Sequence, residues 1–240
     1  MTAITTKAIV INSLKYRETS LIVKLYTEAE GLKSYMIKGV LKSKKSKFKV
    51  GYFQPLTLLQ IEANHITNRT LYTLKEVQVS HAYQNLPFDI IKQSIVLFLS
   101  EILTYSIKEE ETNGLLYNYL ENSLLWLDNH NKITNFHLLF LLNLTKYLGI
   151  YPDVSLDDAV TFNLIQGKFS KSFNEKGSLS QKEFSVFKRI LGVNFDDVES
   201  ISFNKLERQI VLQVLIRYFE LHLDGFKKPK SLEVLETVFK

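Results

Sequence analysis

The residue types that most often perform catalysis are scattered along this sequence. No phosphate-binding glycine loop or nucleophile-elbow motif is present, and the histidines show no HxH, HxxxH or HExxH spacing. His137 stands in a very apolar stretch, where a hydrogen-bonded core histidine is expected rather than a metal ligand. Asp157 with Asp158, and Asp196 with Asp197, fall in expected loops, where adjacent carboxylates rarely converge on one metal. We therefore predict no catalytic residue, no metal site and no enzymatic activity.

Residues 31–50 carry the strongest chemical signal. They contain seven lysines and no acidic residue, with aromatic residues inside the segment and directly after it. Such a density of like charge is unfavourable at low salt unless a polyanion is bound. Lysines neutralise phosphates while aromatic rings stack on unpaired bases, which is the usual arrangement in single-strand grooves. The predicted nucleic-acid-binding residues are Lys33, Tyr35, Lys38, Lys42, Lys44, Lys45, Lys47 and Lys49.

The charge distribution supports a binding face in this part of the chain, although two alternatives remain. Residues 1–80 hold 13 Lys and Arg against 5 Asp and Glu, whereas residues 81–240 hold 17 against 20. A polyanion-binding face on the first third would explain this asymmetry. A solvated loop would also explain the lysine run, and Tyr35 and Phe53 would then be barrel core.

Cysteine is absent, which excludes disulfides, thiolate metal sites and a cysteine nucleophile. The N-terminal residues lack the apolar core and cleavage site of a signal peptide. No apolar stretch approaches the roughly 20 residues of a membrane span. We expect a soluble cytoplasmic protein that uses no cofactor and has no membrane partner.

The first 80 residues predict strands and the remainder predicts mainly helices, an α+β protein. Runs rich in β-branched and aromatic residues are residues 8–13, 20–27, 32–38, 55–63 and 71–79, with a bulge near Lys75. Five strands with connections too short for crossover helices predict a closed barrel, most simply an OB-fold, with an SH3-like barrel as the alternative. We predict an OB-fold domain over residues 1–80 and a helical domain over residues 81–240.

Helical periodicity begins beyond His81. Apolar residues at helical spacing predict helices at residues 89–107, 113–128, 136–148, 181–191 and 205–223. A last short helix should run to Phe239 and be capped by Ser231. An irregular insertion is expected at about residues 150–180, with a small hairpin around Gln166 and Gly167.

Three stretches of the sequence resemble the RecO family of bacterial recombination mediators. The opening TKAIVINSLKYRETSLIVKLYTEAEGLKSYMIKGVLKSKKS is similar to the family's start, and a Gln-Pro pair opens its later strand. FHLLFLLNLTKYLGIYPDV resembles the family's helix ending in Leu-Gly-aromatic-x-Pro, and HLDGFKKPKSLEVLETV resembles its C-terminal helix. The matching positions are Glu18 to Ser20, Thr27, Gly31, Lys38 with Gly39, Ser43 to Ser46, Gln54 with Pro55, Leu148 to Pro152 and Lys230 to Leu232.

The resemblance implies a non-enzymatic protein that binds single- and double-stranded DNA, anneals complementary strands and acts with RecR to load the RecA recombinase. It also implies that the helical domain binds the acidic C-terminal tail of the single-stranded-DNA-binding protein, and a nucleoid-associated location. For this tail we predict Lys188 and Arg189, which stand beside Phe184 and Phe187; the alternative is that both phenylalanines are core and both cations solvated.

This sequence departs from the family at the zinc site. Many members carry four cysteines after the Leu-Gly-x-x-Pro element, whereas the corresponding residues here include none. We predict that packing replaces the metal, through Phe162, Leu164, Phe169 and Phe173.

Three rival functions stay open. An OB-fold RNA-binding or translation-associated module would share the lysine run without needing the long helical domain. A protein-interaction scaffold would bind nucleic acid weakly and with little dependence on salt. A hydrolase is the least favoured because the motifs that it needs are missing.

Overall fold

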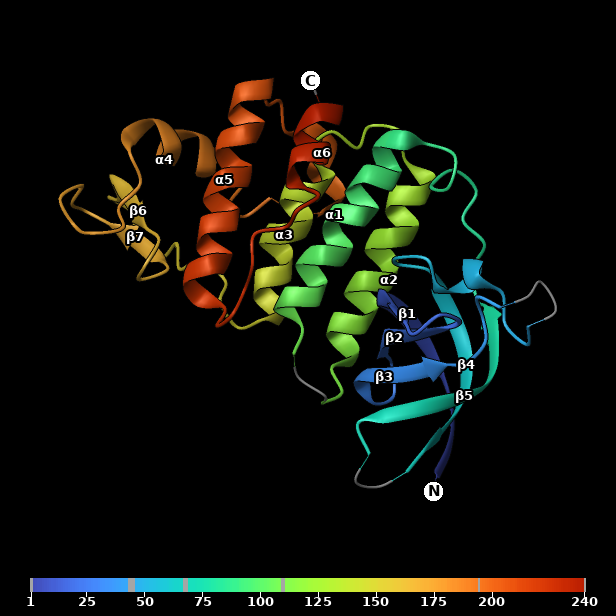
Figure 1. Cartoon of the computed structure of the whole chain (residues 1–240). Helices are drawn as coiled ribbons and strands as arrows, with labels where there is room; N and C mark the ends of the chain where they lie inside the picture. Colours follow the sequence, from blue (N-terminus) through green and yellow to red (C-terminus); the bar gives the residue numbers. More distant parts are fainter. Residues whose placement is uncertain (1, 43–45, 67–68, 109–110, 194, 240) are drawn as a thin grey trace. The chain divides into compact units, whose positions relative to one another are not determined.

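Five strands at the N-terminal end hydrogen-bond into a closed barrel, drawn from blue to turquoise in Figure 1. Their order around the barrel is β1–β2–β3–β5–β4; β3 and β5 pair in parallel and the other neighbours are antiparallel. This is the five-stranded Greek-key barrel of the OB-fold, so the predicted α+β fold is confirmed. The strands are β1 (Thr2–Tyr16), β2 (Ser20–Thr27), β3 (Gly31–Ile37), β4 (Leu58–His65) and β5 (Leu71–Val79). The structure is a computed structural model that describes residues 2–42, 46–66, 69–108, 111–193 and 195–239.

Two bulges interrupt the strand register. The predicted bulge at Lys75 is confirmed, because Glu62 pairs with Glu76 and the next residue of β4 pairs with Leu74. A second bulge, which we did not predict, lies at Ile11 of β1, between the Val10 pair and the Asn12 pair with β2. A bulge inserts one residue into a strand and redirects the side chains that follow it.

The barrel interior is filled by apolar side chains from all five strands, and Phe53 from the 3-10 helix η1 (Val50–Phe53) belongs to the same core cluster. Ile9 and Ile11, on β1 outside this interior cluster, are also fully buried. Ser100 of α1 donates a hydrogen bond to the carbonyl of Ile11 over 2.7 Å, so the helix is fixed at the bulge. Burial of each such aliphatic side chain stabilises the fold by roughly 1.5–3 kcal/mol.

Two helices pack with the barrel. They are α1 (Ile90–Ser106) and α2 (Gly114–Asn129), and the chain divides into two compact units, Met1–Asn129 and His130–Lys240. Lys7 of β1 forms an ion pair with Glu121 of α2 at 3.1 Å, and the rings of Tyr26 and Tyr117 stack. These contacts explain why α2 groups with the barrel. The domain division predicted at residue 80 stays a prediction.

A buried carboxylate fixes the connection between the barrel and α1. Asp128, at the end of α2, is fully buried and accepts backbone hydrogen bonds from Gln84, Asn85 and Leu86 at 2.7–2.9 Å. The buried Lys92 ammonium donates to the Asp128 carbonyl over 2.8 Å. Burial alone raises the pKa of Asp128, but the three backbone donors and Lys92 outweigh it and hold the pKa below its ordinary value.

The second unit is helical, as predicted. Its helices are α3 (Phe136–Tyr147), α4 (Gln181–Phe187), the 3-10 helix η2 (Phe195–Ser200), α5 (Lys205–His222) and α6 (Leu232–Val238). Nearly every residue of α3 is buried, which agrees with its continuous apolar sequence. Capping boxes begin α4 at Ser180 and α5 at Asn204. Ser231 precedes α6 but makes no side-chain capping hydrogen bond, so that detail of the prediction was wrong.

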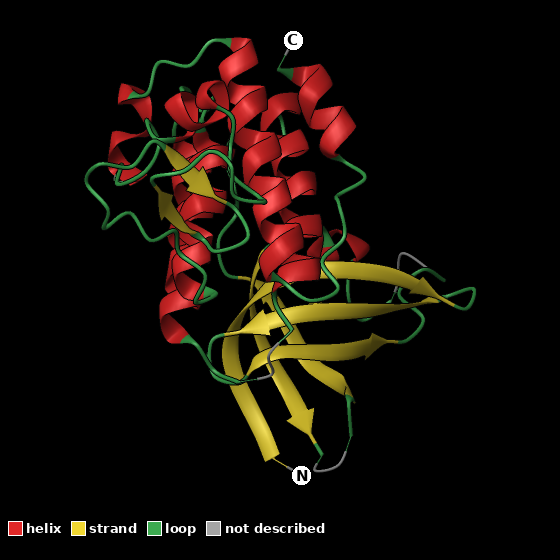
Figure 2. Ribbon diagram, turned by 90° about the vertical axis from the view of Figure 1, so that its left-hand side faces the viewer, coloured by secondary structure: helices red, strands yellow, loops and turns green. Residues whose placement is uncertain are grey.

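The predicted hairpin is present in the insertion, as β6 (Thr161–Asn163) and β7 (Lys168–Ser170), seen as the two short arrows among the helices in Figure 2. Gly167 turns the chain with φ of 67°, and a Cβ there would lie 2.7 Å from the Tyr218 hydroxyl oxygen of α5. Only glycine satisfies both conditions. The hairpin packs on α4 and α5 through contacts of the Phe162 ring with Phe187 and Tyr218.

Aromatic and aliphatic packing therefore holds the insertion. Phe162, Leu164 and Phe169 are buried as predicted, whereas Phe173 is 46% exposed and was wrongly included. Phe173 lies beyond β7, which ends at Ser170.

Candidate nucleic-acid interface

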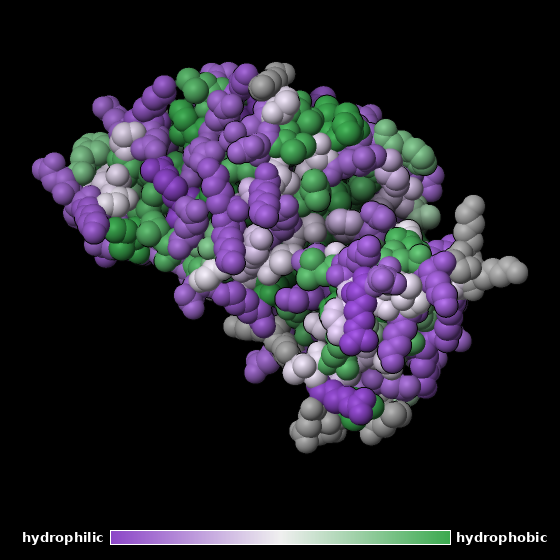
Figure 3. Space-filling view, viewed as in Figure 1, coloured by the Kyte–Doolittle hydropathy of each residue, from purple (hydrophilic) through white to green (hydrophobic). Residues whose placement is uncertain are grey.

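The lysine-rich segment, residues 31–50, begins as strand β3 and continues as an irregular connection into η1. Lys38, Lys42, Lys47 and Lys49 are exposed and Lys33 is half-buried; the predicted Lys44 and Lys45 lie outside the described residues. None of Lys42, Lys47 and Lys49 forms an ion pair with a described residue. Hydrophilic side chains cover much of the barrel face that Figure 3 shows. Lys42, Lys47 and Lys49 therefore present positive charge that no acidic residue in the described part of the chain pairs with.

A cleft of about 610 Å³ lies along this segment. Phe48 forms part of its wall. The Phe48 ring is half-buried and packs edge-to-face on Phe53, with centroids 6.4 Å apart. The Lys47 ammonium stands 5.4 Å from the centroid of the Phe48 ring, a cation–π contact. An aromatic ring and a cation thus meet at the cleft, which is lined by Val40, Leu41, Lys42, Ser46, Phe48, Lys49 and Val50.

Tyr35, which was predicted as a binding residue, does not line this cleft. Its side chain is fully buried in the barrel core, and its hydroxyl is 2.9 Å from Nε2 of His65. A base cannot reach this ring while the barrel is closed, so we leave Tyr35 out of the interface. The core role that the sequence left open is the one observed for Tyr35 and also for Phe53, which is 2% exposed.

A cluster around His65 was not predicted from any local pattern. Nδ1 of His65 contacts the Glu30 carboxylate at 2.5 Å, and its ring packs against Tyr72 with centroids 4.3 Å apart. Burial, then the nearby Glu30 carboxylate, raises the pKa of Tyr35 far above its usual range. The four residues come from separate parts of the sequence and join the turn before β3 to the end of β4. Their arrangement is that of a hydrogen-bonded and aromatic network at this end of the barrel strands.

Lys188 and Arg189, the two cations predicted to bind the tail, differ from each other in their contacts. Lys188 is exposed, and its ammonium stands 5.9 Å from the ring centroids of Phe169 and Phe184. Arg189 forms an ion pair with Glu207 and also donates to the Ser202 carbonyl. Phe184 and Phe187 are both buried, as the core alternative expected. The structure therefore places Lys188 beside the rings of Phe169 and Phe184, whereas Arg189 is bound to Glu207.

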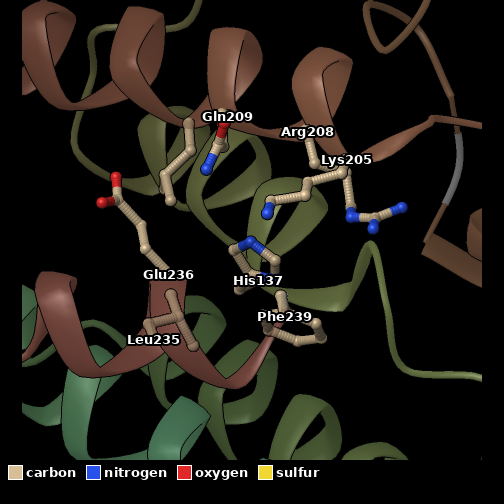
Figure 4. A pocket seen from close by; sticks show the side chains of 8 residues that line it. His137, Lys205, Arg208, Gln209, Leu235, Glu236 and Phe239 are labelled. Carbon is tan, nitrogen blue, oxygen red and sulfur yellow. The ribbon is translucent and has the colours of Figure 1, made fainter.

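A small cavity between α3, α5 and α6 was also missed by the sequence reasoning. Figure 4 shows the side chains of Lys205, Arg208 and His137 around it, with Phe239 across from α5. Burial, together with the Arg208 charge, lowers the pKa of His137 to about 3, so the ring is neutral near pH 7. The cavity measures about 20 Å³, enough for one water-sized group but not for a side chain.

Two features of the described residues bear on other classes of function. Among those residues, no group of three or more His, Asp or Glu side chains is arranged to hold a metal ion. None of the helices described is both long and apolar enough to cross a membrane.

Comparison with known proteins gives one consistent answer. The model of the recombination protein O N-terminal domain matches residues 1–83, and the model of the C-terminal domain matches residues 87–233. DNA repair protein RecO of Flavobacterium psychrophilum is 50% identical over 236 residues, covering 98% of this chain and 99% of that protein. The proteins of the same name from Flavobacterium johnsoniae and Christiangramia forsetii are 49% and 48% identical, over 98% of this chain and 99% and 98% of theirs. The chain belongs to the RecO family of DNA repair proteins.

Proposed function

We propose that this chain binds single- and double-stranded DNA through the lysine-rich segment, anneals complementary strands and helps RecR to load a recombinase. The observation that carries the proposal is the set of exposed, uncompensated lysines beside the Phe48 cleft. Membership of a DNA repair family supports DNA as the polyanion. We further propose that the protein acts in the bacterial cytoplasm at the nucleoid.

The proposed chemistry is electrostatic and needs no catalytic group or cofactor. Each lysine that neutralises a phosphate releases a condensed counterion, which drives binding without regard to sequence. Two strands held on one positive surface repel each other less, so complementary bases meet more often. Phe48 supplies an apolar face for an unpaired base, with Lys47 placed for the adjoining phosphate.

Charge reversal tests this proposal. Replacement of Lys42, Lys44, Lys45 and Lys47 by Glu should weaken binding of labelled single-stranded DNA at least about tenfold, measured by fluorescence anisotropy. The logarithm of the wild-type affinity should fall linearly with the logarithm of salt concentration, by roughly 0.7 per contacted phosphate, and the variant should show a shallower slope.

The matched control has the same change in net charge at exposed lysines of the helical unit: Lys176, Lys182, Lys227 and Lys228, each replaced by Glu. Circular dichroism should show both variants folded. Equal loss of affinity in both would mean that net charge alone attracts the DNA. An unchanged binding curve in the segment variant would remove the segment from the interface. Competition between DNA and RNA strands of one sequence would favour the RNA-binding alternative if RNA displaced DNA at equal or lower concentration.

We also propose that the helical unit binds the acidic C-terminal tail of the single-stranded-DNA-binding protein. The support is family membership and the exposed Lys188 ammonium above two aromatic rings, a place where a carboxylate would find a charged partner. A synthetic tail peptide should bind with roughly micromolar affinity, as small interfaces do. Replacement of Lys188 and Arg189 by Ala should weaken that binding, measured by calorimetry.

The two components of this tail proposal can fail separately. Binding that persists undiminished in the double variant would place the site away from Lys188 and Arg189. Absence of binding at low salt would reject the tail as a partner of this chain.

A further inference from the structure

A second cavity lies on the barrel unit, where the bulged end of β1 faces helix α1. Its volume is about 440 Å³, within the range of roughly 300–1,000 Å³ that small-ligand sites occupy. The wall is mixed: amide, hydroxyl and carboxyl groups alternate with apolar and aromatic side chains. The residues that the argument uses are Asn12, Ser13, Phe53, Gln54, Leu97 and Glu101.

The bulge in β1 explains why polar groups line this cavity. Ile11 is the extra residue, and its carbonyl accepts the Ser100 hydroxyl of α1 at 2.7 Å, which holds strand and helix in place. Asn12 and Ser13 follow immediately and line the cavity. Bulges commonly redirect side chains in this way beside functional sites.

Ser13 gives the cavity a feature that packing alone does not explain. Its hydroxyl oxygen is buried and has no hydrogen-bond partner in the part of the chain that the structure describes. A buried hydroxyl without a partner costs free energy, and native structures seldom keep one without a reason. A ligand or ordered water in the cavity would supply the missing partner.

The cavity continues from the lysine-rich segment. Val50, the first residue of η1, lines both the Phe48 cleft and this second cavity, and Lys49 directly precedes it. A strand whose phosphates follow Lys42 and Lys49 would therefore pass the cavity mouth. This placement ties the cavity to the interface proposed above.

The lining chemistry selects a base over a phosphate. Glu101 would repel a phosphate, but its carboxylate can accept a hydrogen bond from an amino group. The amides of Asn12 and Gln54 both donate and accept, while Phe53 and Leu97 offer apolar contact. Proteins that read single strands combine these elements around a base turned out of its stack.

We propose that this cavity receives one unpaired base of the bound strand, with preference for a base that carries an exocyclic amino group. The inference rests on the proposed function, because Lys42, Lys47 and Lys49 must hold the backbone for a base to enter. Cytosine presents an amino donor to the Glu101 carboxylate, whereas thymine presents a carbonyl oxygen at the same edge. Adenine shares the amino donor with cytosine and should bind similarly.

The probes are oligodeoxycytidine, oligothymidine and an abasic backbone of equal length, roughly 16 nucleotides, the upper site size for one OB-fold. The wild type should bind oligodeoxycytidine about tenfold more tightly than the abasic backbone, with oligothymidine between them. Salt slopes should be equal for the three, since each has the same phosphates.

Variants at the cavity separate binding from folding. Ser13→Ala and Gln54→Ala should each weaken binding of oligodeoxycytidine about threefold or more without changing the salt slope or the binding of the abasic backbone. Ser13→Ala should leave the melting temperature unchanged or raised, because it removes an unsatisfied buried group. Ser100→Ala, the matched control, removes a formed hydrogen bond and should lower the melting temperature. Glu101→Gln should bring the affinities for oligodeoxycytidine and oligothymidine closer together.

The outcomes distinguish the two proposals. If no probe shows salt-dependent binding, the proposed function fails and this inference fails with it. If all three probes bind equally with normal salt slopes, and the cavity variants bind like the wild type, the segment binds DNA but the cavity takes no base. A melting temperature lowered by Ser13→Ala would give the hydroxyl a structural role and would overturn its part in the inference.

Discussion

Lys42, Lys47 and Lys49 on the barrel are exposed and form no ion pair with a described residue, whereas Arg189 and Arg217 of the helical unit are each bound to a glutamate. The first group lies within a sequence segment, residues 31–50, that contains no acidic residue. In the second group the partners are 18 and 34 residues away, and contacts between α4, α5 and the residues near them bring them together. In the helical unit these two cations are therefore already bound by carboxylates that are distant in the sequence.

The contrast indicates two uses of charge in one chain. Cations without an ion-pair partner among the described residues are available to a partner, and their mutual repulsion slightly opposes folding. Paired cations support the fold modestly and would have to leave their partners to bind something else. We therefore expect charge changes on the barrel to alter binding, and charge changes at paired sites to alter stability.

The largest effect on stability should come from Asp128, the most completely compensated charge in the barrel unit. Asp128→Asn keeps the shape, but its amide group would face the backbone donors of Gln84, Asn85 and Leu86 with a donor of its own. We expect the free energy of unfolding to fall by about 3–5 kcal/mol. Urea unfolding followed by circular dichroism measures it.

A matched control for this prediction lies on the same helix. Asn118→Ala, at an exposed position of α2, should change the free energy of unfolding by less than about 0.5 kcal/mol. Equal midpoints for Asp128→Asn and the wild type would show that the buried network does not stabilise the fold.

The pH dependence of stability should report the same carboxylate. The pKa of Asp128 is lowered in the folded state from its ordinary value of 3.8, so its contribution is fully present above that value. The contribution is lost as the pH falls from 3.8 through the lower folded-state pKa. Asp128→Asn should therefore flatten the acid side of the stability profile. If the profile keeps its wild-type slope there, other carboxylates control the acid transition.

Much of the barrel could be predicted because its strands show local signals. The ranges of β2 and β5 match the prediction, and the broken alternation around Lys75 revealed a bulge. The bulge at Ile11 left no such sign, because Ala8, Ile9, Val10 and Ile11 are all fully buried. A strand covered on both faces reads as a continuous apolar run, and such a run hides a shift in register.

The candidate site was predictable only where it was continuous in sequence. The lysine run could be found because its members are neighbours, but the base cavity combines a bulge, a 3-10 helix and α1. Tyr35 could be assigned to the core once β3 paired with β2, since it lies opposite the inward Val23. The Arg189 pair with Glu207 depends on tertiary packing, so no local pattern indicates that this cation is already bound.

The smallest predicted effect tests the contrast between the paired arginines and the exposed lysines directly. Arg217→Ala removes the ion pair with Glu183, and we expect a loss of about 0.2–1 kcal/mol that disappears at high salt. Burial raises the pKa of Glu183, but hydrogen bonds from Ser180 and the Arg217 charge outweigh it, so its pKa should rise in the variant.

Lys49→Ala removes an uncompensated charge and should leave the free energy of unfolding unchanged or slightly higher at low salt. Urea titrations of both variants at low and high salt provide the comparison. If Arg217→Ala lowers the free energy of unfolding no more than Lys49→Ala does at low salt, the ion pair with Glu183 does not stabilise the fold, and pairing does not separate the two groups of cations.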